Sequence, residues 1–90
     1  MKVYREREVI AIVRGLSHRR LRAWVERGLV APRRRDGEYL FDEVDVARLR
    51  LLGTIRKEMG IADADLSLVM ALVDQIYGLR RQLRRLLAAL

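Results

Sequence analysis

The sequence predicts a mainly α-helical protein, a winged helix-turn-helix with a small β-hairpin wing and a long C-terminal helix. Two short amphipathic segments flank a Gly-Leu-Ser turn at residues 15–17, Asp36-Gly37 divides two extended segments, and apolar residues recur at 3-4 spacing along residues 63–90. No repeat or linker interrupts the chain. We therefore expect one domain over residues 1–90, with the winged helix at about 4–60 and the last helix at about 63–90.

The helix-turn-helix is expected from its turn and cap residues. A first helix at about 7–14 ends at Gly15, where a positive φ costs little. Ser17 then offers its hydroxyl oxygen to the free amides at the start of a second helix, at about 18–27. Trp24 falls on the apolar side of this second helix, so we expect it in the core and not as a platform on which bases stack.

The wing and the two later helices follow from turn and cap signals as well. Both central residues of a type I′ hairpin turn need positive φ, and Asp36-Gly37 satisfies that need. Asp42 is expected to cap a third helix that stops at Gly60, and Asp63 is expected to cap the last helix. We expect the third helix to bury one apolar face, made of Val44, Ala47, Leu51, Ile55 and Met59.

Positive charge is concentrated in the first part of the chain. The net charge is +7, and residues 1–41 hold eleven Lys or Arg against five acids, whereas residues 42–90 hold eight against seven. A basic half indicates a nucleic-acid partner, but arginine that only coats a solvated surface gives the same pattern, and charge alone leaves both open. If DNA is the partner, the candidate contacts are Ser17, His18, Arg19, Arg20 and Arg22 on the second helix and Arg33, Arg34 and Arg35 on the wing.

The sequence offers little for catalysis or for a bound cofactor. It has no cysteine, His18 is its only histidine, and it lacks a Gly-rich phosphate loop. We expect neither an enzyme nor a cofactor, metal or small-molecule ligand. The charged N-terminus and the short apolar runs also predict no membrane segment, and hence a cytoplasmic protein, nucleoid-associated if it binds DNA.

The last helix carries two adjacent apolar stripes. At about 1.5 Å per residue it would be about 40 Å long, more than a domain this small covers. One stripe follows heptad spacing, a pattern typical of a helix that pairs with a second chain. We therefore expect a homodimer whose contact residues are Val69, Leu72, Ile76, Leu79, Leu83 and Leu86. The other stripe consists of Leu66, Met70, Val73 and Tyr77.

From about residue 4 to 60 the chain resembles the MerR family. The family's Gly-Val-Ser-x-x-Thr-Leu-Arg pattern is matched by Gly15-Leu16-Ser17-His18-Arg19-Arg20-Leu21-Arg22. Its later Gly-Leu, Pro and Asp-Val-x-x-Leu elements are matched by Gly28-Leu29, Pro32 and Asp45-Val46-Ala47-Arg48-Leu49. The resemblance implies a winged helix in which Arg22 contacts phosphate. The wing departs from the family pattern, because Glu38 and Tyr39 stand where MerR proteins usually have Tyr and Arg. That departure weakens the expectation of DNA binding, although residues 33–35 supply other arginines.

The later part of the chain resembles a narrower group, the CbpM-type chaperone modulators. Their Leu/Val/Met-rich helix is matched by Met70-Ala71-Leu72-Val73-Asp74-Gln75-Ile76-Tyr77-Gly78-Leu79, and their basic, Leu-rich tail by residues 80–90. This resemblance implies binding to the J-domain of a DnaJ/CbpA-like co-chaperone and inhibition of its action with Hsp70 (DnaK). J-domains present a basic helix, so we expect it to meet an acidic, partly apolar surface made of Asp63, Asp65, Leu66, Met70, Asp74 and Tyr77. The alternative is a MerR-like DNA-binding transcriptional regulator.

Overall fold

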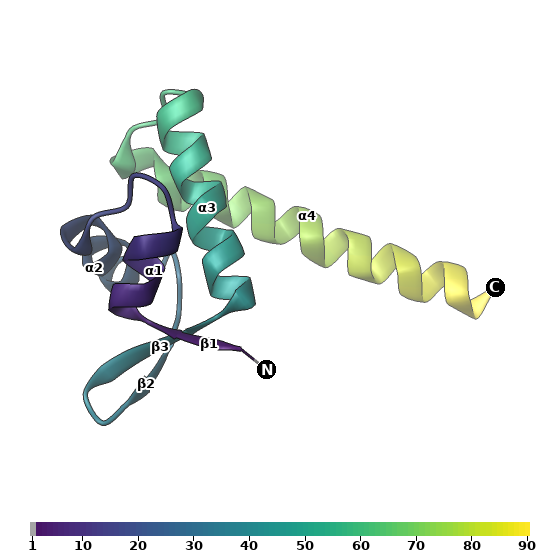
Figure 1. Cartoon of the computed structure of the whole chain (residues 1–90). Helices are drawn as coiled ribbons and strands as arrows, with labels where there is room; N and C mark the ends of the chain where they lie inside the picture. The colour runs from purple at the N-terminus through teal and green to yellow at the C-terminus, as the bar shows by residue number, and fades with distance from the viewer. Residues whose placement is uncertain (1) are drawn as a thin grey trace.

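The computed structural model describes residues 2–90, which contain four helices and three short strands joined by turns and loops. In chain order they are β1 (Val3–Arg5), α1 (Glu6–Ile12), α2 (His18–Glu26), β2 (Arg33–Arg35), β3 (Glu38–Asp42), α3 (Glu43–Glu58) and α4 (Asp63–Ala89). Figure 1 shows the helix-turn-helix of α1 and α2 beside α3, the wing below them, and α4 extending far beyond this body. The predicted winged helix-turn-helix with a hairpin wing and a long last helix is confirmed.

The wing is the β2–β3 hairpin, and a further strand extends it. The strands form an antiparallel sheet in the order β1-β3-β2, in which Tyr4 pairs with Phe41. Asp36 has a φ of 51° and Gly37 a φ of 79°, which confirms the predicted turn. Strand β1 was not predicted, because three residues next to a helix are too few to show alternation. Their extended conformation comes from pairing with β3.

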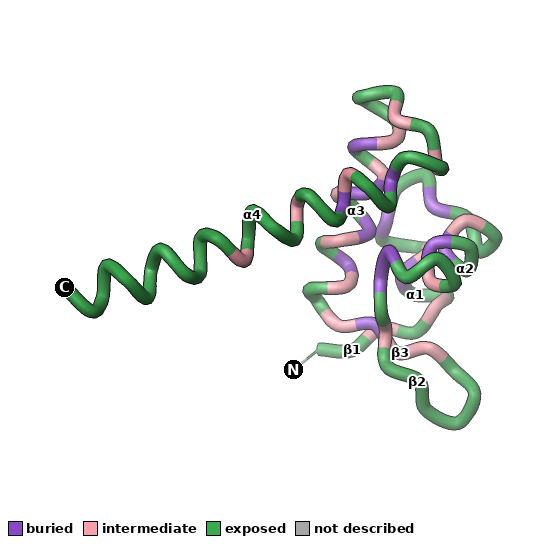
Figure 2. Tube along the Cα trace, turned by 180° about the vertical axis from the view of Figure 1, so that it is seen from behind, coloured by how far each residue is buried: buried purple, intermediate pink, exposed green. Residues whose placement is uncertain are grey.

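One hydrophobic core joins the winged helix to the first turns of α4. Its largest fully buried side chains include Trp24 from α2, Phe41 from β3 and Leu49 from α3. Leu66 and Met70 of α4 are 0% and 2% exposed and belong to the same core. Trp24 is therefore a core residue, as expected. Figure 2 shows buried residues near the start of α4 and exposed residues along the rest of the helix.

The buried face of α3 is not the one that sequence analysis predicted. The residues that it buries are Val46, Leu49, Leu52 and Ile55. Of the predicted face, Ile55 is buried and Leu51 half-buried, but Val44, Ala47 and Met59 are exposed. Two adjacent faces of this helix each carry an apolar stripe, so periodicity does not choose between them. Packing makes the choice, because the buried face of α3 belongs to the same core as Trp24 and Phe41.

The caps of α2 and α3 are those that the sequence predicted, whereas the cap of α4 is not. Ser17 and Asp42 each accept a hydrogen bond from the backbone amide three residues later, at 3.1 and 2.8 Å. The N-cap of α4 is Ala62, which has no side-chain oxygen to offer. Asp63 is instead the first residue of α4, and its carboxylate lies 3.2 Å from Nε of Arg56 on α3. The prediction of Asp63 as a cap is thus wrong.

Candidate functional site

A groove lies where α1, α2 and the wing meet. It has a volume of about 550 Å³, and its lining includes four arginines and three glutamates. Helix α2 contributes His18 and Arg22, α1 contributes Glu6, and the wing contributes Arg34 and Glu38. A winged helix presents this face to nucleic acid. Because the acids nearly balance the arginines, the groove lacks the strong positive potential that attracts a phosphate backbone.

Glu6 holds two of the predicted DNA-binding residues. Nδ1 of His18 and Nε of Arg22 lie 2.7 and 3.1 Å from the same atom, Oε2 of Glu6. Both reach it because they lie one turn apart on one face of α2. Burial by itself would raise the pKa of Glu6, but the hydrogen bonds with His18 and Arg22 outweigh it and lower that pKa. Glu6 could not be singled out from the sequence, because acids are common in the first turn of a helix.

Some of the other predicted DNA contacts are exposed, and others make contacts within the chain. Those that are exposed are Arg19 on α2 and Arg33, Arg34 and Arg35 on the edge strand β2, while Arg20 is half-buried. Ser17 serves as the cap of α2. The guanidinium of Arg34 lies 5.3 Å from the centre of the Tyr39 ring, and Arg5 lies 3.7 Å from Glu38. The wing thus retains exposed positive charge, but acidic and aromatic side chains stand beside it.

A second groove lies between α3 and α4. Its volume is about 720 Å³, and it is lined by Val44, Ala47 and Leu51 from α3 and by Val73 and Tyr77, among others, from α4. Its α3 wall is the stripe that sequence analysis assigned to the core. Because α3 mainly buries the neighbouring face, Val44 and Ala47 of this stripe stay exposed, and exposed apolar residues that line a groove are typical of a contact surface.

Arg48 and Asp74 join α3 to α4 at the second groove. Nη1 and Nη2 of Arg48 donate hydrogen bonds to Oδ1 and Oδ2 of Asp74 at 2.8 and 3.0 Å, and Nε of Arg48 donates to the carbonyl oxygen of Leu29. The hydrogen bonds from Arg48 lower the pKa of Asp74, and they raise the pKa of Arg48. A bidentate pair of this kind fixes orientation as well as distance, so it sets how α4 leaves the domain.

We expect this ion pair to make stability sensitive to acid. Because the folded-state pKa of Asp74 is lowered, its contribution is complete above the unfolded pKa of about 4 and is lost as the pH falls through the folded value. Arg48→Gln should therefore lose less free energy of unfolding than the wild type between about pH 6 and pH 3. The difference should be modest, since the Asp74 side chain is 54% exposed. Urea titrations at the two pH values measure it, and equal losses would contradict a stabilising pair.

The six residues predicted to bind a protein partner do not form one exposed surface. Leu66 and Met70 are core residues, so their side chains are not available to a partner and that part of the prediction is wrong. Asp63 and Asp74 are paired with arginines of α3. Three of the six, Met70, Asp74 and Tyr77, line the α3–α4 groove. The exposed members of the set are Asp65, Asp74 and Tyr77.

Most of the predicted dimer seam is exposed. Val69 is half-buried and packs against the core, and the exposed members are Leu72, Ile76, Leu79, Leu83 and Leu86. The other stripe of α4 packs on the winged helix, through Leu66, Met70 and Val73. An apolar stripe of this length, left uncovered, is typical of a contact surface. Within residues 2–90, no helix combines the length and the apolar character needed to cross a membrane.

Comparison with protein families gives a match that fits this geometry. Residues 4–72 match the family described as MerR HTH family regulatory protein. The matched region takes in the helix-turn-helix, the wing, α3 and the buried part of α4, and is well over half of the chain. Comparisons with curated proteins and with solved structures find no match. The chain belongs to the MerR helix-turn-helix family.

Proposed function

We propose that this MerR-type chain is a CbpM-type chaperone modulator, which binds the J-domain of a DnaJ/CbpA-like co-chaperone and inhibits its action with Hsp70 (DnaK). The observation that carries the proposal is the apolar groove between α3 and α4. It lies in the part of the chain that resembles the modulators, and it is lined by Asp74 and Tyr77, two exposed residues among the six predicted to meet the partner. The balanced charge of the other groove supports the same choice, because it does not favour DNA.

The groove offers a helix of the partner an apolar floor and two kinds of charge. Val44 and Tyr77, whose side chains are largely exposed, supply contact area. We place the basic helix of the J-domain beside Asp74, whose lowered pKa keeps the carboxylate ionised and whose side chain is 54% exposed. Arg81 and Arg84 also line the groove, and there we place acidic groups of the J-domain. Binding therefore depends on shape and apolar area as much as on charge.

A MerR-like DNA-binding transcriptional regulator is the second candidate. It is favoured by the exposed arginines at 33–35 and at Arg19, and by the regulatory description of the matched family. If about six basic residues met phosphates, the logarithm of the affinity would fall with the logarithm of the salt concentration with a slope near −5. A tight, salt-sensitive and sequence-specific DNA complex, together with no binding to a J-domain, would support this candidate and contradict the first.

The groove is tested by placing a charge in it. Val44→Asp should weaken binding to a J-domain by about tenfold or more, because a hydrated carboxylate would replace the apolar contact area that Val44 adds beside Leu51 and Tyr77. Val44 is 74% exposed in the free chain, so the variant should still fold. Calorimetric titration of the full chain with the J-domain measures affinity, and the ATPase rate of Hsp70 with its co-chaperone measures inhibition.

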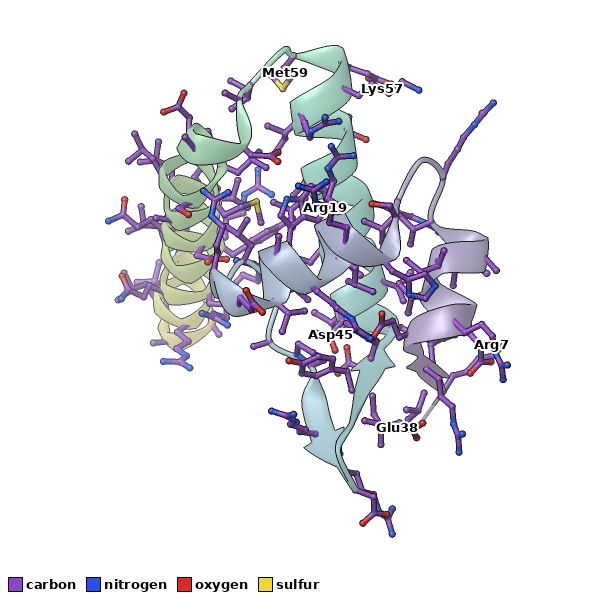
Figure 3. The ribbon with its side chains drawn as sticks, turned by 90° about the vertical axis from the view of Figure 1, so that its left-hand side faces the viewer. Arg7, Arg19, Glu38, Asp45, Lys57 and Met59 are labelled. Atoms are coloured by element: carbon purple, nitrogen blue, oxygen red, sulfur yellow. The ribbon has the colours of Figure 1, made fainter. Side chains whose placement is uncertain are left out.

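Met59→Asp is the matched control for the groove. Met59 is 68% exposed and caps the far end of α3, outside the groove, so the same substitution there should leave affinity within about twofold. Figure 3 shows Met59 at the end of α3 away from the wing. Equal losses in the two variants would place the J-domain elsewhere on the chain. No binding by the wild type would reject the chaperone-modulator function itself.

A further inference from the structure

Several of the polar and charged side chains around the groove of α1, α2 and the wing are paired within the chain. Oε2 of Glu6 lies 2.7 Å from Nδ1 of His18 and 3.1 Å from Nε of Arg22. On the wing, Nη1 of Arg5 lies 3.7 Å from Oε2 of Glu38. The proposed binding of a J-domain uses α3 and α4 and gives these contacts no part. They lie instead on the face that a winged helix presents to nucleic acid.

The Glu6 carboxylate lies at a point on α2 that is suited to an anion from solution. Arg22 carries a positive charge, and His18 lies in the first turn of α2, where the positive end of the helix dipole is felt, so the point between the two side chains favours a negative group. A nucleic-acid phosphate is such a group. The Glu6 carboxylate already fills this point, and its side chain is only 18% exposed. Arg22 and His18, two side chains that would meet a phosphate backbone, therefore already have a partner.

We infer that Glu6 is an internal competitor for phosphate, which keeps the helix-turn-helix face from binding nucleic acid. Because Glu6 belongs to the same chain, it is present at an effective concentration in the millimolar range or above, whereas a nucleic acid has to reach the same point from solution. A phosphate that displaces Glu6 also leaves the carboxylate unpaired next to a polyanion, which costs further free energy. The inference concerns a surface separate from the α3–α4 groove and holds whether or not that groove binds a J-domain.

Neutralising Glu6 should therefore create affinity for DNA. Glu6→Gln keeps the shape of the side chain and removes its charge, so Arg22 becomes available to a phosphate. We expect the full-length variant to bind a mixed-sequence DNA duplex about tenfold more tightly than the wild type at low salt. The slope of log affinity against log salt should steepen by about 1, the value for one added phosphate contact. Fluorescence anisotropy of labelled DNA over a salt series measures both quantities.

Glu58→Gln is the control with the same change in net charge. Glu58 is exposed and lies between Lys57 and Met59 at the end of α3, away from Glu38 on the wing (Figure 3), and its substitution should change DNA affinity by less than about twofold. If Glu6→Gln gains no more affinity than Glu58→Gln, Glu6 does not compete with phosphate and the inference fails.

A double substitution shows which cation is responsible for the gain. Glu6→Gln with Arg22→Gln should return the DNA affinity to that of the wild type, because the released guanidinium is gone. A gain that survives in the double variant would contradict the inference. If circular dichroism shows that Glu6→Gln does not fold, Glu6→Asp replaces it, since it keeps the acid in the first turn of α1 but shortens the reach to Arg22. A gain of about threefold is then expected, and no gain would count against the inference in the same way.

Discussion

Leu66→Ala is expected to lower the free energy of unfolding by about 3 kcal/mol, a large fraction of the total for a domain of this size. The Leu66 side chain is 0% exposed and packs in the core that joins α4 to the winged helix. Alanine removes apolar contacts and leaves a cavity that the surrounding side chains fill only in part. Urea titration followed by circular dichroism at one fixed protein concentration measures the change.

Leu68→Ala is the control for this prediction. Leu68 lies half a turn further along α4 and is 65% exposed, so the same truncation should change the free energy of unfolding by no more than about 0.5 kcal/mol. Equal effects at the two positions would mean that α4 is not docked on the domain in solution. Leu66 would then be available to a partner, as the sequence alone suggested.

Ile76→Asp is expected to separate a homodimer into single chains. We propose that the exposed stripe of α4 pairs two copies, because Ile76 and Leu83 are 51% and 55% exposed and lie on one heptad face. A carboxylate at Ile76 would be buried in the seam without a counter-charge. We therefore expect the dissociation constant of the dimer to rise by about 100-fold or more. Sedimentation analysis over a range of protein concentrations measures that constant.

Ala71→Asp provides the comparison for the seam. Ala71 is an exposed residue of α4 that lies outside the heptad stripe, so this variant should remain a dimer. A wild-type chain that is monomeric at every concentration would contradict the proposed seam. So would a similar loss of dimer in Ala71→Asp and Ile76→Asp, since the effect would then come from a weakened helix and not from the contact surface.

The candidate surfaces were partly predictable. His18 and Arg22 were predicted from the sequence as candidate DNA contacts on α2, and both line the groove. Their partner Glu6, which lies 12 and 16 residues away along the chain, was not predicted. Asp74 was also predicted without Arg48, which lies 26 residues away. The residue types that carry charge are visible in the sequence, but their pairing depends on how the helices pack.

The α3–α4 groove illustrates the same limit for apolar residues. Each of the two helices carries two apolar stripes, and periodicity does not rank them. On α3 only one stripe was predicted from the sequence, and it is not the one that the helix mainly buries. The structure buries Leu49 of α3 and Leu66 of α4, and it leaves Val44 and Ile76 exposed. Packing decides which stripe of each helix is buried, because the stripe that packs against Trp24 and Phe41 is removed from water. The other stripe stays exposed.

The sequence alone specified the features that depend on neighbouring residues. Ser17 and Asp42 cap the helices that follow them, Asp36-Gly37 makes the hairpin turn, and Gly60 adopts the positive φ that ends α3. Each of these follows from groups within about four residues of one another, where geometry and hydrogen bonding are local. The tertiary structure decided the pairing of β1 with β3, the buried faces of α3 and α4, and the partners of the charged side chains. Those outcomes depend on contacts between distant segments, and such contacts exist only once the core has brought the segments together.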